Sequence, residues 1–186
     1  MDSILRLTNT LTNSKEIFSP IQDGKIGIYA CGVTVYDECH LGHAMQAILF
    51  DTFVQYLKYR GLDVTYVRNY TDVDDKIIHR AQQLGMTPLE LSNQMIEKSR
   101  EDMESLGVHP ADFEPKVSDN IAEIVDYIQE LVNKGYAYET DQGEVYFRVL
   151  NKKDYGKLSN QNPSQLLVGH RIDSNESKEN PLDFAL

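Results

Sequence analysis

The spacing of apolar residues between positions 25 and 69 constrains the fold more than any other feature of the sequence. In KIGIYAC, residues 25–31, apolar residues alternate, which predicts a strand. After this strand, the apolar residues have the i, i+3, i+4, i+7 spacing of one helix face, at Phe50, Phe53, Val54 and Leu57. This spacing predicts a helix from about 42 to 60. Residues 63–69, DVTYVRN, predict a second strand. Strand, helix and strand in this order form a βαβ unit, so we expect a parallel sheet in an α/β fold.

Helical patterns continue after this unit. Four apolar residues at helical spacing predict one short helix: Ile77, Ile78, Ala81 and Leu84. Thr87 and Glu90, with a proline between them, form a capping box that opens a helix to about Leu106. A further apolar face runs from Ile121 to Val132, and residues 136–149 predict a β-hairpin that turns at 141–143.

The proline-containing loop GVHPADFEP, residues 107–115, predicts a boundary between two lobes. We therefore expect one domain of residues 1–115 and a second of residues 116–186, made of a helix and a β-hairpin. The size of the chain agrees, because 186 residues that are 41% hydrophobic can build one or two cores.

Composition narrows the function classes. A net charge of −11 argues against general electrostatic binding of nucleic acid, since phosphate contacts need Lys and Arg. The two cysteines, the short apolar runs and an N-terminus without a basic start or a long apolar region predict a soluble, cytoplasmic protein that neither spans nor binds a membrane.

The stretch CGVTVYDECHLGHA, residues 31–44, lies at the predicted strand-to-helix junction. Ligands of parallel α/β sheets bind at such junctions, where the helix N-terminus attracts phosphate. His40 and His43 are three residues apart, so both imidazoles lie on the first helical turn, and Gly42 between them lets a nucleotide approach the backbone. The pattern suits stabilisation of the charge that develops during attack at an α-phosphorus.

HLGH, residues 40–43, resembles the HIGH signature of class I aminoacyl-tRNA synthetases. Further segments resemble the cysteinyl-tRNA synthetase family in the expected order, over nearly the whole chain: CGVTVYDECHLGHA (31–44), TYVRNYTDVDDKIIHRA (65–81), FEPK (113–116), GYAYE (135–139), VYF (145–147), DYGKLS (154–159) and PLDFAL (181–186). The resemblance implies the first half of a Rossmann-like nucleotide-binding fold with an inserted α+β connective lobe.

The resemblance also implies roles for particular residues. Cys31 matches a cysteine that ligates one zinc ion, to which the substrate cysteine binds through its thiolate. Residues expected to bind the substrate amino acid are Gly32, Thr34 and Thr71. Residues expected at ATP, which binds with Mg²⁺, are Thr34, Tyr36, His40, Gly42 and His43, and the two histidines are the expected catalytic residues.

The implied function is that of a monomeric cysteine–tRNA ligase, which converts L-cysteine and ATP to cysteinyl-adenylate and then acylates tRNA-Cys. In the family, the other zinc ligands, the KMSKS lysine loop and the anticodon-binding domain follow the PLDFAL segment. We therefore expect the chain to be an N-terminal fragment that is inactive alone, with zinc occupancy in doubt.

Two departures from the family pattern concern the site. Val33 stands where the family usually has a proline, so a φ constraint is lost while the shape of the turn is expected to persist. Met45 and Gln46 stand in the region where an arginine often follows the HIGH segment. Because this cation is missing, we do not assume that the nucleotide site has the affinity or the tight packing of the family.

Alternatives stay open at this level. The chain could be a non-catalytic binding module with residual affinity for ATP or RNA, a mycothiol-type ligase that acylates an amino sugar, or a generic HxGH nucleotidylyltransferase.

A local metal site is conceivable from Cys31, Cys39, His40 and His43, although packing is the expected role of Cys39. Asp74 and Asp75 suit either a functional role or a helix N-terminus. For four aromatic residues, we favour the buried side of a hairpin over stacking on RNA bases: Tyr136, Tyr138, Tyr146 and Phe147.

Overall fold

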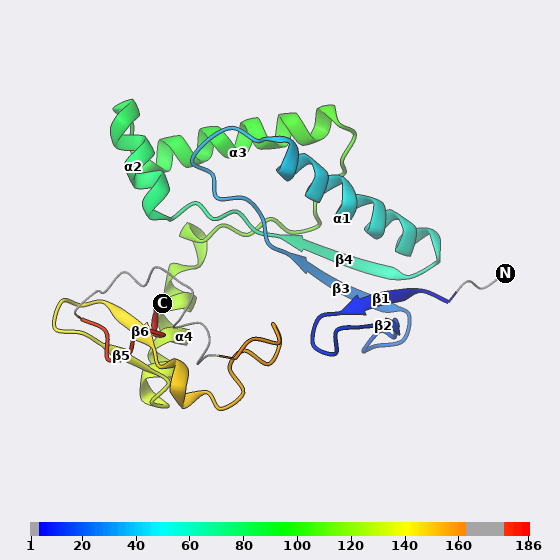
Figure 1. Cartoon of the computed structure of the whole chain (residues 1–186). Coiled ribbons are helices and arrows are strands. Elements are labelled where there is room, and N and C mark those ends of the chain that lie inside the picture. Colours follow the sequence, from blue (N-terminus) through cyan, green and yellow to red (C-terminus); the bar gives the residue numbers. More distant parts are fainter. Residues whose placement is uncertain (1–3, 163–176) are drawn as a thin grey trace. The chain divides into compact units, whose positions relative to one another are not determined.

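The computed structural model describes residues 4–162 and 177–186 (Figure 1). Within the chain, residues 20–121 form one compact unit, and residues 1–19 together with 122–186 form another. These bounds differ from those of the expected domains, 1–115 and 116–186: residues 1–19 group with residues 122–186, and residues 116–117 belong to a segment that pairs with the first unit. The interpretation of the two units as a catalytic half and an inserted lobe stays a prediction.

The first unit is built on the predicted βαβ arrangement. Strand β3 (Lys25–Ala30) pairs in parallel with β4 (Asp63–Arg68), and helix α1 (Leu41–Tyr59) connects them. Residues 113–117 extend the sheet on the other side of β4, where Val67 and Tyr70 form parallel bridges. The predictions of an α/β fold and of a parallel sheet are confirmed.

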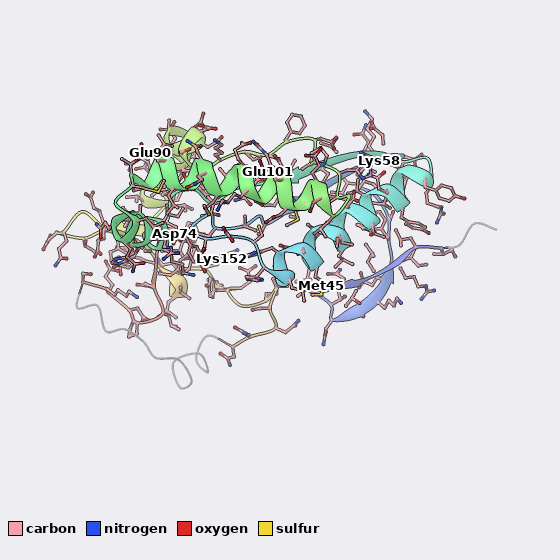
Figure 2. All side chains as sticks on the ribbon, turned by 90° about the horizontal axis from the view of Figure 1, so that it is seen from above. Met45, Lys58, Asp74, Glu90, Glu101 and Lys152 are labelled. Atoms are coloured by element: carbon pink, nitrogen blue, oxygen red, sulfur yellow. The ribbon has the colours of Figure 1, made fainter. Side chains whose placement is uncertain are left out.

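Two more helices cover this sheet. Helix α2 (Asp75–Leu84) ends at Gly85 in the left-handed conformation, with φ of 67°. Helix α3 (Pro88–Ser105) begins with the capping box that the sequence predicts. Figure 2 shows Asp74 and Glu90 at the N-terminal ends of α2 and α3. The apolar side chains of both helices close one core cluster: Val35, Tyr70, Ile77, Ala81, Leu91, Met95 and Ile96.

Helix α1 packs against α3 through a second cluster, formed by Ala47, Met103 and Val108. Both helices lie on the same side of β3 and β4 (Figure 1). This side of the sheet is therefore the covered face of the first unit. None of the helices in the described part of the chain is long and apolar enough to cross a membrane.

The second unit contains short elements. Its N-terminal part is a hairpin of β1 (Arg6–Asn9) and β2 (Ser14–Ile17), which the sequence did not indicate. The short helix η1 (Ser118–Asn120) ends the first unit and leads into α4 (Ile121–Asn133), where none of the residues is buried. Strands β5 (Ala137–Glu139), β6 (Val145–Phe147) and β7 (Phe184–Ala185) form an antiparallel sheet, with η2 (Val149–Asn151) after β6. The predicted hairpin is confirmed, whereas β7 was not expected.

The four aromatic residues of the hairpin region divide between its two faces. Tyr138 and Tyr146 are opposite each other and buried, with exposed fractions of 7% and 3%. Tyr136 and Phe147 are partly exposed and stack with each other at a centroid distance of 6.4 Å. The interpretation as the buried side of a hairpin therefore holds for two of the four residues. On β6, Tyr146 and Phe147 point to opposite faces because neighbouring strand positions alternate.

A buried carboxylate holds the hairpin to the end of the chain. Asp183 is 3% exposed and accepts hydrogen bonds from the Tyr138 hydroxyl at 3.1 Å, the Val149 amide at 3.0 Å and the Asn180 amide at 3.2 Å. These donors satisfy a charge that would otherwise be costly to bury. The sequence places Asp183 in a polar tail, so only the structure shows this role.

The two glycines of the β3 region differ sharply in their surroundings. A Cβ added at Gly32 would overlap the backbone carbonyl oxygen of Asn69, whereas a Cβ at Gly27 would meet no atom within 4 Å. We expect Gly32→Ala to lower the free energy of unfolding by about 2–3 kcal/mol or more, because the two chain segments must separate.

Gly27→Ala is the matched control, and we expect it to change the free energy of unfolding by less than about 0.5 kcal/mol. Urea denaturation of both variants measures the difference. Equal stability of the two variants would contradict the close approach of residues 32 and 69.

Candidate functional site

The predicted substrate residues come together at the C-terminal ends of β3 and β4. Thr34 and Thr71 form a parallel bridge, in which the Val35 amide donates to Thr71 O at 3.2 Å and the Thr71 amide donates to Val33 O at 3.1 Å. The bridge continues the β3–β4 pairing beyond the regular strands. Parallel strands end at one edge of their sheet, so residues 37 positions apart in the sequence become neighbours.

Gly32 belongs to the same strand end. Its amide donates to Asn69 Oδ1 at 2.8 Å, and the carbonyl of Asn69 occupies the space that a Cβ would need. The structure therefore gives Gly32 a packing role beside the predicted role in substrate binding. Asn69 was not singled out from the sequence, and its position as the last residue of the predicted strand 63–69 was the available signal.

His40 is the N-cap residue of α1. Its backbone is extended, with φ of −125° and ψ of 173°, and its Nδ1 accepts from the Gly42 amide at 3.0 Å. The His43 ring reciprocates, since its Nδ1 accepts from the His40 amide at 3.3 Å. The two histidines thus form a capping box, in which imidazole nitrogens replace the usual hydroxyl and carboxylate oxygens.

The capping bonds fix the tautomers of both rings. A neutral imidazole that accepts at Nδ1 carries its proton on Nε2. His40 and His43 are therefore both assigned as Nε2–H donors, and their rings stack with a centroid distance of 3.9 Å. The first helical turn consequently presents two hydrogen-bond donors in addition to the positive end of its dipole.

The surroundings of His43 favour its neutral form. Burial lowers the pKa of His43 below its ordinary value, and the neighbouring His40 lowers this pKa further. A neutral ring preserves the Nδ1 lone pair that the cap uses. The pair is therefore suited to donate hydrogen bonds to an anion rather than to act as two cations.

Gly42 has a packing role beside the predicted role at the nucleotide. A Cβ at this position would lie 2.8 Å from Cε1 of His40, so the missing side chain makes room for the capping ring. The amide of Gly42 is used by His40, and the His43 amide donates to His40 O at 2.9 Å. Fewer backbone donors are thus open to phosphate than an uncapped helix would offer.

Tyr36 and Cys31 lie on the same loop and are exposed. The Lys76 ammonium lies 5.7 Å from the centre of the Tyr36 ring, so a cation from α2 stands beside this predicted ATP residue. Cys31 has its carbonyl bound by Gln46 Nε2 at 3.3 Å. Gln46 therefore links α1 to the strand end that carries Cys31, a role that the sequence did not reveal, while Met45 points to solvent (Figure 2).

Val33 and Cys39 are both packing residues. Val33, which stands in place of the family proline, packs against the core cluster around Tyr70. Cys39 packs against the cluster of Ala47, Met103 and Val108. The expectation that Cys39 has a packing role is confirmed.

The acidic residues of TDVDD separate into different roles. Asp72 is 4% exposed and accepts from both the amide and the hydroxyl of Ser118. Asp74 is the N-cap of α2, with Oδ1 accepting from the Lys76 amide at 2.8 Å. The helix N-terminus interpretation therefore fits Asp74, and Asp75 lies in the first turn of the same helix.

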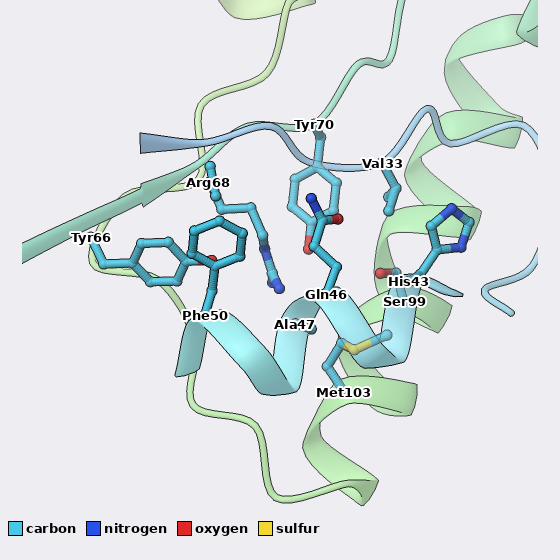
Figure 3. A pocket seen from close by; sticks show the side chains of 11 residues that line it. Val33, His43, Gln46, Ala47, Phe50, Tyr66, Arg68, Tyr70, Ser99 and Met103 are labelled. Carbon is cyan, nitrogen blue, oxygen red and sulfur yellow. The ribbon is translucent and has the colours of Figure 1, made fainter. Parts of the chain in front are cut away.

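Two cavities adjoin this region. The smaller one, of about 20 Å³, lies under α1 and is lined by His43, Gln46, Arg68, Tyr70 and Ser99 among others (Figure 3). Its volume is on the scale of one water molecule, so it is not a nucleotide pocket. The larger cavity, of about 320 Å³, is lined by Arg68 and Arg100, and both of these pair with Glu114 at 2.9 and 3.2 Å.

A zinc site is not assembled by the described residues. No group of three or more His, Cys, Asp or Glu side chains in residues 4–162 and 177–186 is arranged to hold a metal ion. The conceivable site of Cys31, Cys39, His40 and His43 is thus not formed in this part of the chain, where Cys39 Sγ instead donates to Ser99 Oγ on α3. One thiol does not satisfy the tetrahedral preference of zinc.

The arrangement defines a class of protein. A parallel β3–β4 pair with an HxGH-capped helix between the strands is the first part of a nucleotide-binding α/β fold. Residues 17–186 match the family model described as tRNA synthetases class I (C) catalytic domain. The chain belongs to this family.

Individual relatives agree with the family. The chain is 49% identical to a cysteine–tRNA ligase of Thermodesulfovibrio yellowstonii over 98% of its own length and 38% of the relative. It is 50% identical to a cysteine–tRNA ligase of Geobacillus thermodenitrificans over 99% of its length and 39% of that relative. The chain thus spans about two fifths of the length of these curated relatives.

A solved structure shares the fold. The LeuRS chain in a ternary complex of an Agrobacterium radiobacter LeuRS with tRNA and LeuAMS superposes with a TM-score of 0.56 at 19% identity. The match covers 72% of this chain and 18% of that one. At this identity, the likeness confirms the class I fold.

The lowered pKa of His43 predicts a pH dependence of stability. The unfolded chain takes up the His43 proton near pH 6.5, whereas the folded chain takes it up only at lower pH. The contribution of His43 to stability is therefore fully present above about pH 6.5, and is lost as the pH falls through the lowered folded-state pKa. NMR titration of the His43 ring should give a midpoint below that of the same ring in the urea-unfolded chain. An equal or higher midpoint in the folded chain would contradict the neutral capping role.

Proposed function

We propose that this chain forms the first part of the active site of a cysteine–tRNA ligase. The observation that carries the proposal is the shared edge at which Thr34 and Thr71 are paired and the His40–His43 capping box begins α1. The family and the curated cysteine–tRNA ligases support the choice of amino acid.

The proposed first step is adenylation. A carboxylate oxygen of L-cysteine attacks the α-phosphorus of ATP, the bond from that phosphorus to the bridging oxygen breaks, and pyrophosphate leaves. The Nε2–H groups of His40 and His43 donate to phosphate oxygens as their negative charge increases. Because the rings are held by the capping bonds, the donors need little reorganisation.

In the proposed second step, a terminal ribose hydroxyl of tRNA-Cys attacks the carbonyl carbon of cysteinyl-adenylate, and AMP leaves. Thr34, Thr71 and Gly32 lie at the strand ends and are proposed to bind the amino acid. Tyr36 is proposed to contact the nucleotide, and Mg²⁺ to accompany ATP.

Zinc is proposed to bind through Cys31, with the remaining ligands supplied by the part of the relatives that this chain does not span. When bound, the ion would accept the substrate thiolate and discriminate against serine, whose neutral hydroxyl is a poor zinc ligand. The exposed position of Cys31 at the strand end leaves its sulfur accessible for such a site.

Catalysis by the histidine pair can be tested with cysteine-dependent ATP–pyrophosphate exchange. We expect no detectable exchange by this chain alone, and exchange by a chimera that joins the chain to the remaining length of the Thermodesulfovibrio yellowstonii relative. His43→Ala in the chimera should lower the exchange rate by roughly 10²-fold or more, because it removes one donor at the developing charge.

His79→Ala is the control, because His79 is exposed on α2 and outside the site. A folded chimera without exchange would support the alternative of a non-catalytic binding module. Exchange that is followed by acylation of glucosaminyl-inositol, but not of tRNA-Cys, would support the mycothiol-type ligase instead.

The role of Cys31 predicts the metal content of the chimera. Elemental analysis should find about one zinc ion per chain, and Cys31→Ser should lose most of it because the thiolate ligand is removed. Cys39→Ser is the control that should keep the ion. Loss of zinc in both variants, or in neither, would contradict the assignment of Cys31 as the ligand.

A further inference from the structure

Ser99 lies in the middle of α3, outside every motif of the sequence. Its side chain is buried, with an exposed fraction of 5%, and its Oγ accepts a hydrogen bond from Cys39 Sγ at 3.3 Å. Cys39 is the residue directly before the N-cap His40. A polar group of α3 is therefore connected, through one hydrogen bond and one peptide unit, to the residue that begins α1.

Ser99 also lies near His43, the second histidine of the capping box. Ser99 and His43 line the small cavity under α1, and Figure 3 shows both side chains at its edge. Because this cavity is only about 20 Å³, the groups around it are closely packed. Ser99 is thus near the capping box from two directions, through Cys39 and through the cavity.

The other side-chain contacts of this loop are more exposed to water. Asp37 pairs with Arg80 at 3.7 Å and Glu38 pairs with Lys98 at 2.7 Å, but all four side chains are between 39% and 66% exposed. Exposed ion pairs contribute little to stability and are screened by salt. The Cys39–Ser99 bond is less exposed than these ion pairs, because Ser99 is buried, so water and salt compete with it less.

We propose that Ser99 is a positioning residue for the His40–His43 pair. By accepting from Cys39, Ser99 fixes the point at which the loop enters α1, and thereby the directions of the two Nε2–H groups. The catalytic consequence rests on the proposed function, whereas the structural consequence can be measured on the histidine rings alone.

The test compares two buried serines of the same helix. Ser92 is fully buried, but its hydroxyl donates to Leu89 O within α3 at 3.1 Å and has no connection to the loop. We expect Ser99→Ala and Ser92→Ala to lower Tm by a similar amount, roughly 2–4 °C. Only Ser99→Ala should shift the imidazole NMR signals of His40 and His43, while those of His79 and His109 stay in place.

Two further variants separate the hydroxyl from packing. Ser99→Thr keeps the hydroxyl and should restore both imidazole signals, whereas Ser99→Val, which has the same shape without the hydroxyl, should not. Cys39→Ala should produce the same shifts as Ser99→Ala, and the double variant should add nothing to them. Unshifted histidine signals in Ser99→Ala, or equal behaviour of the Thr and Val variants, would overturn the proposal.

Activity provides a separate readout. In the chimera, Ser99→Ala should lower kcat for ATP–pyrophosphate exchange by roughly 10-fold to 100-fold with little change in the KM for ATP, as expected for misplaced catalytic groups. Imidazole shifts without any exchange in the unsubstituted chimera would support the positioning role and count against the proposed function. Full exchange activity in Ser99→Ala would overturn the catalytic part of the inference.

Discussion

The site depends on the position of the C-terminal end of β4. This segment is held on one side by the bridge of Thr71 to Thr34, and on the other by residues 113–117, where the Tyr70 amide donates to Pro115 O at 2.9 Å. Tyr70 itself is 1% exposed in the core cluster. Pairing on both sides and burial below leave the strand end little freedom, so Gly32, Thr34 and Thr71 keep a fixed relation to one another.

The histidine capping box is a second constraint on the geometry of the site. In most helices the capping groups are hydroxyls or carboxylates, which have no further function. Here the caps are imidazoles, so the bonds that begin α1 also set the tautomers and the directions of the Nε2–H groups. The same capping hydrogen bonds therefore stabilise the start of α1 and orient the expected catalytic groups.

The sequence predicted the elements whose apolar residues follow one clear period. The β3–α1–β4 unit, the capping box of α3 and the β5–β6 hairpin are all present, because local spacing and capping chemistry specify them. The strand β7, the pairing of residues 113–117 with β4 and the buried Asp183 were missed. Each depends on a partner far away in the sequence, and short segments carry no signal for such a partner.

In the candidate site, too, the sequence identified some residues but did not show how others contact the site. The sequence singled out Cys31, His40, His43 and Thr71, and it assigned Gly42 to nucleotide approach; the structure adds that the missing side chain of Gly42 makes room for the His40 ring. The sequence likewise did not show that Gln46 and Ser99 contact the site, from α1 and α3. Tertiary packing decides whether a side chain meets the site, since helix spacing alone does not identify its neighbours.

The sequence by itself determined the α/β class, the strand-to-helix junction and the presence of two histidines at the start of the helix. It could do so because a βαβ unit and a helix cap are encoded by residues within a few turns of one another. Only the tertiary structure decided that burial lowers the pKa of His43 and that Ser99 connects α3 to the start of α1. These properties depend on distances between groups up to 60 positions apart, which packing of the whole unit fixes.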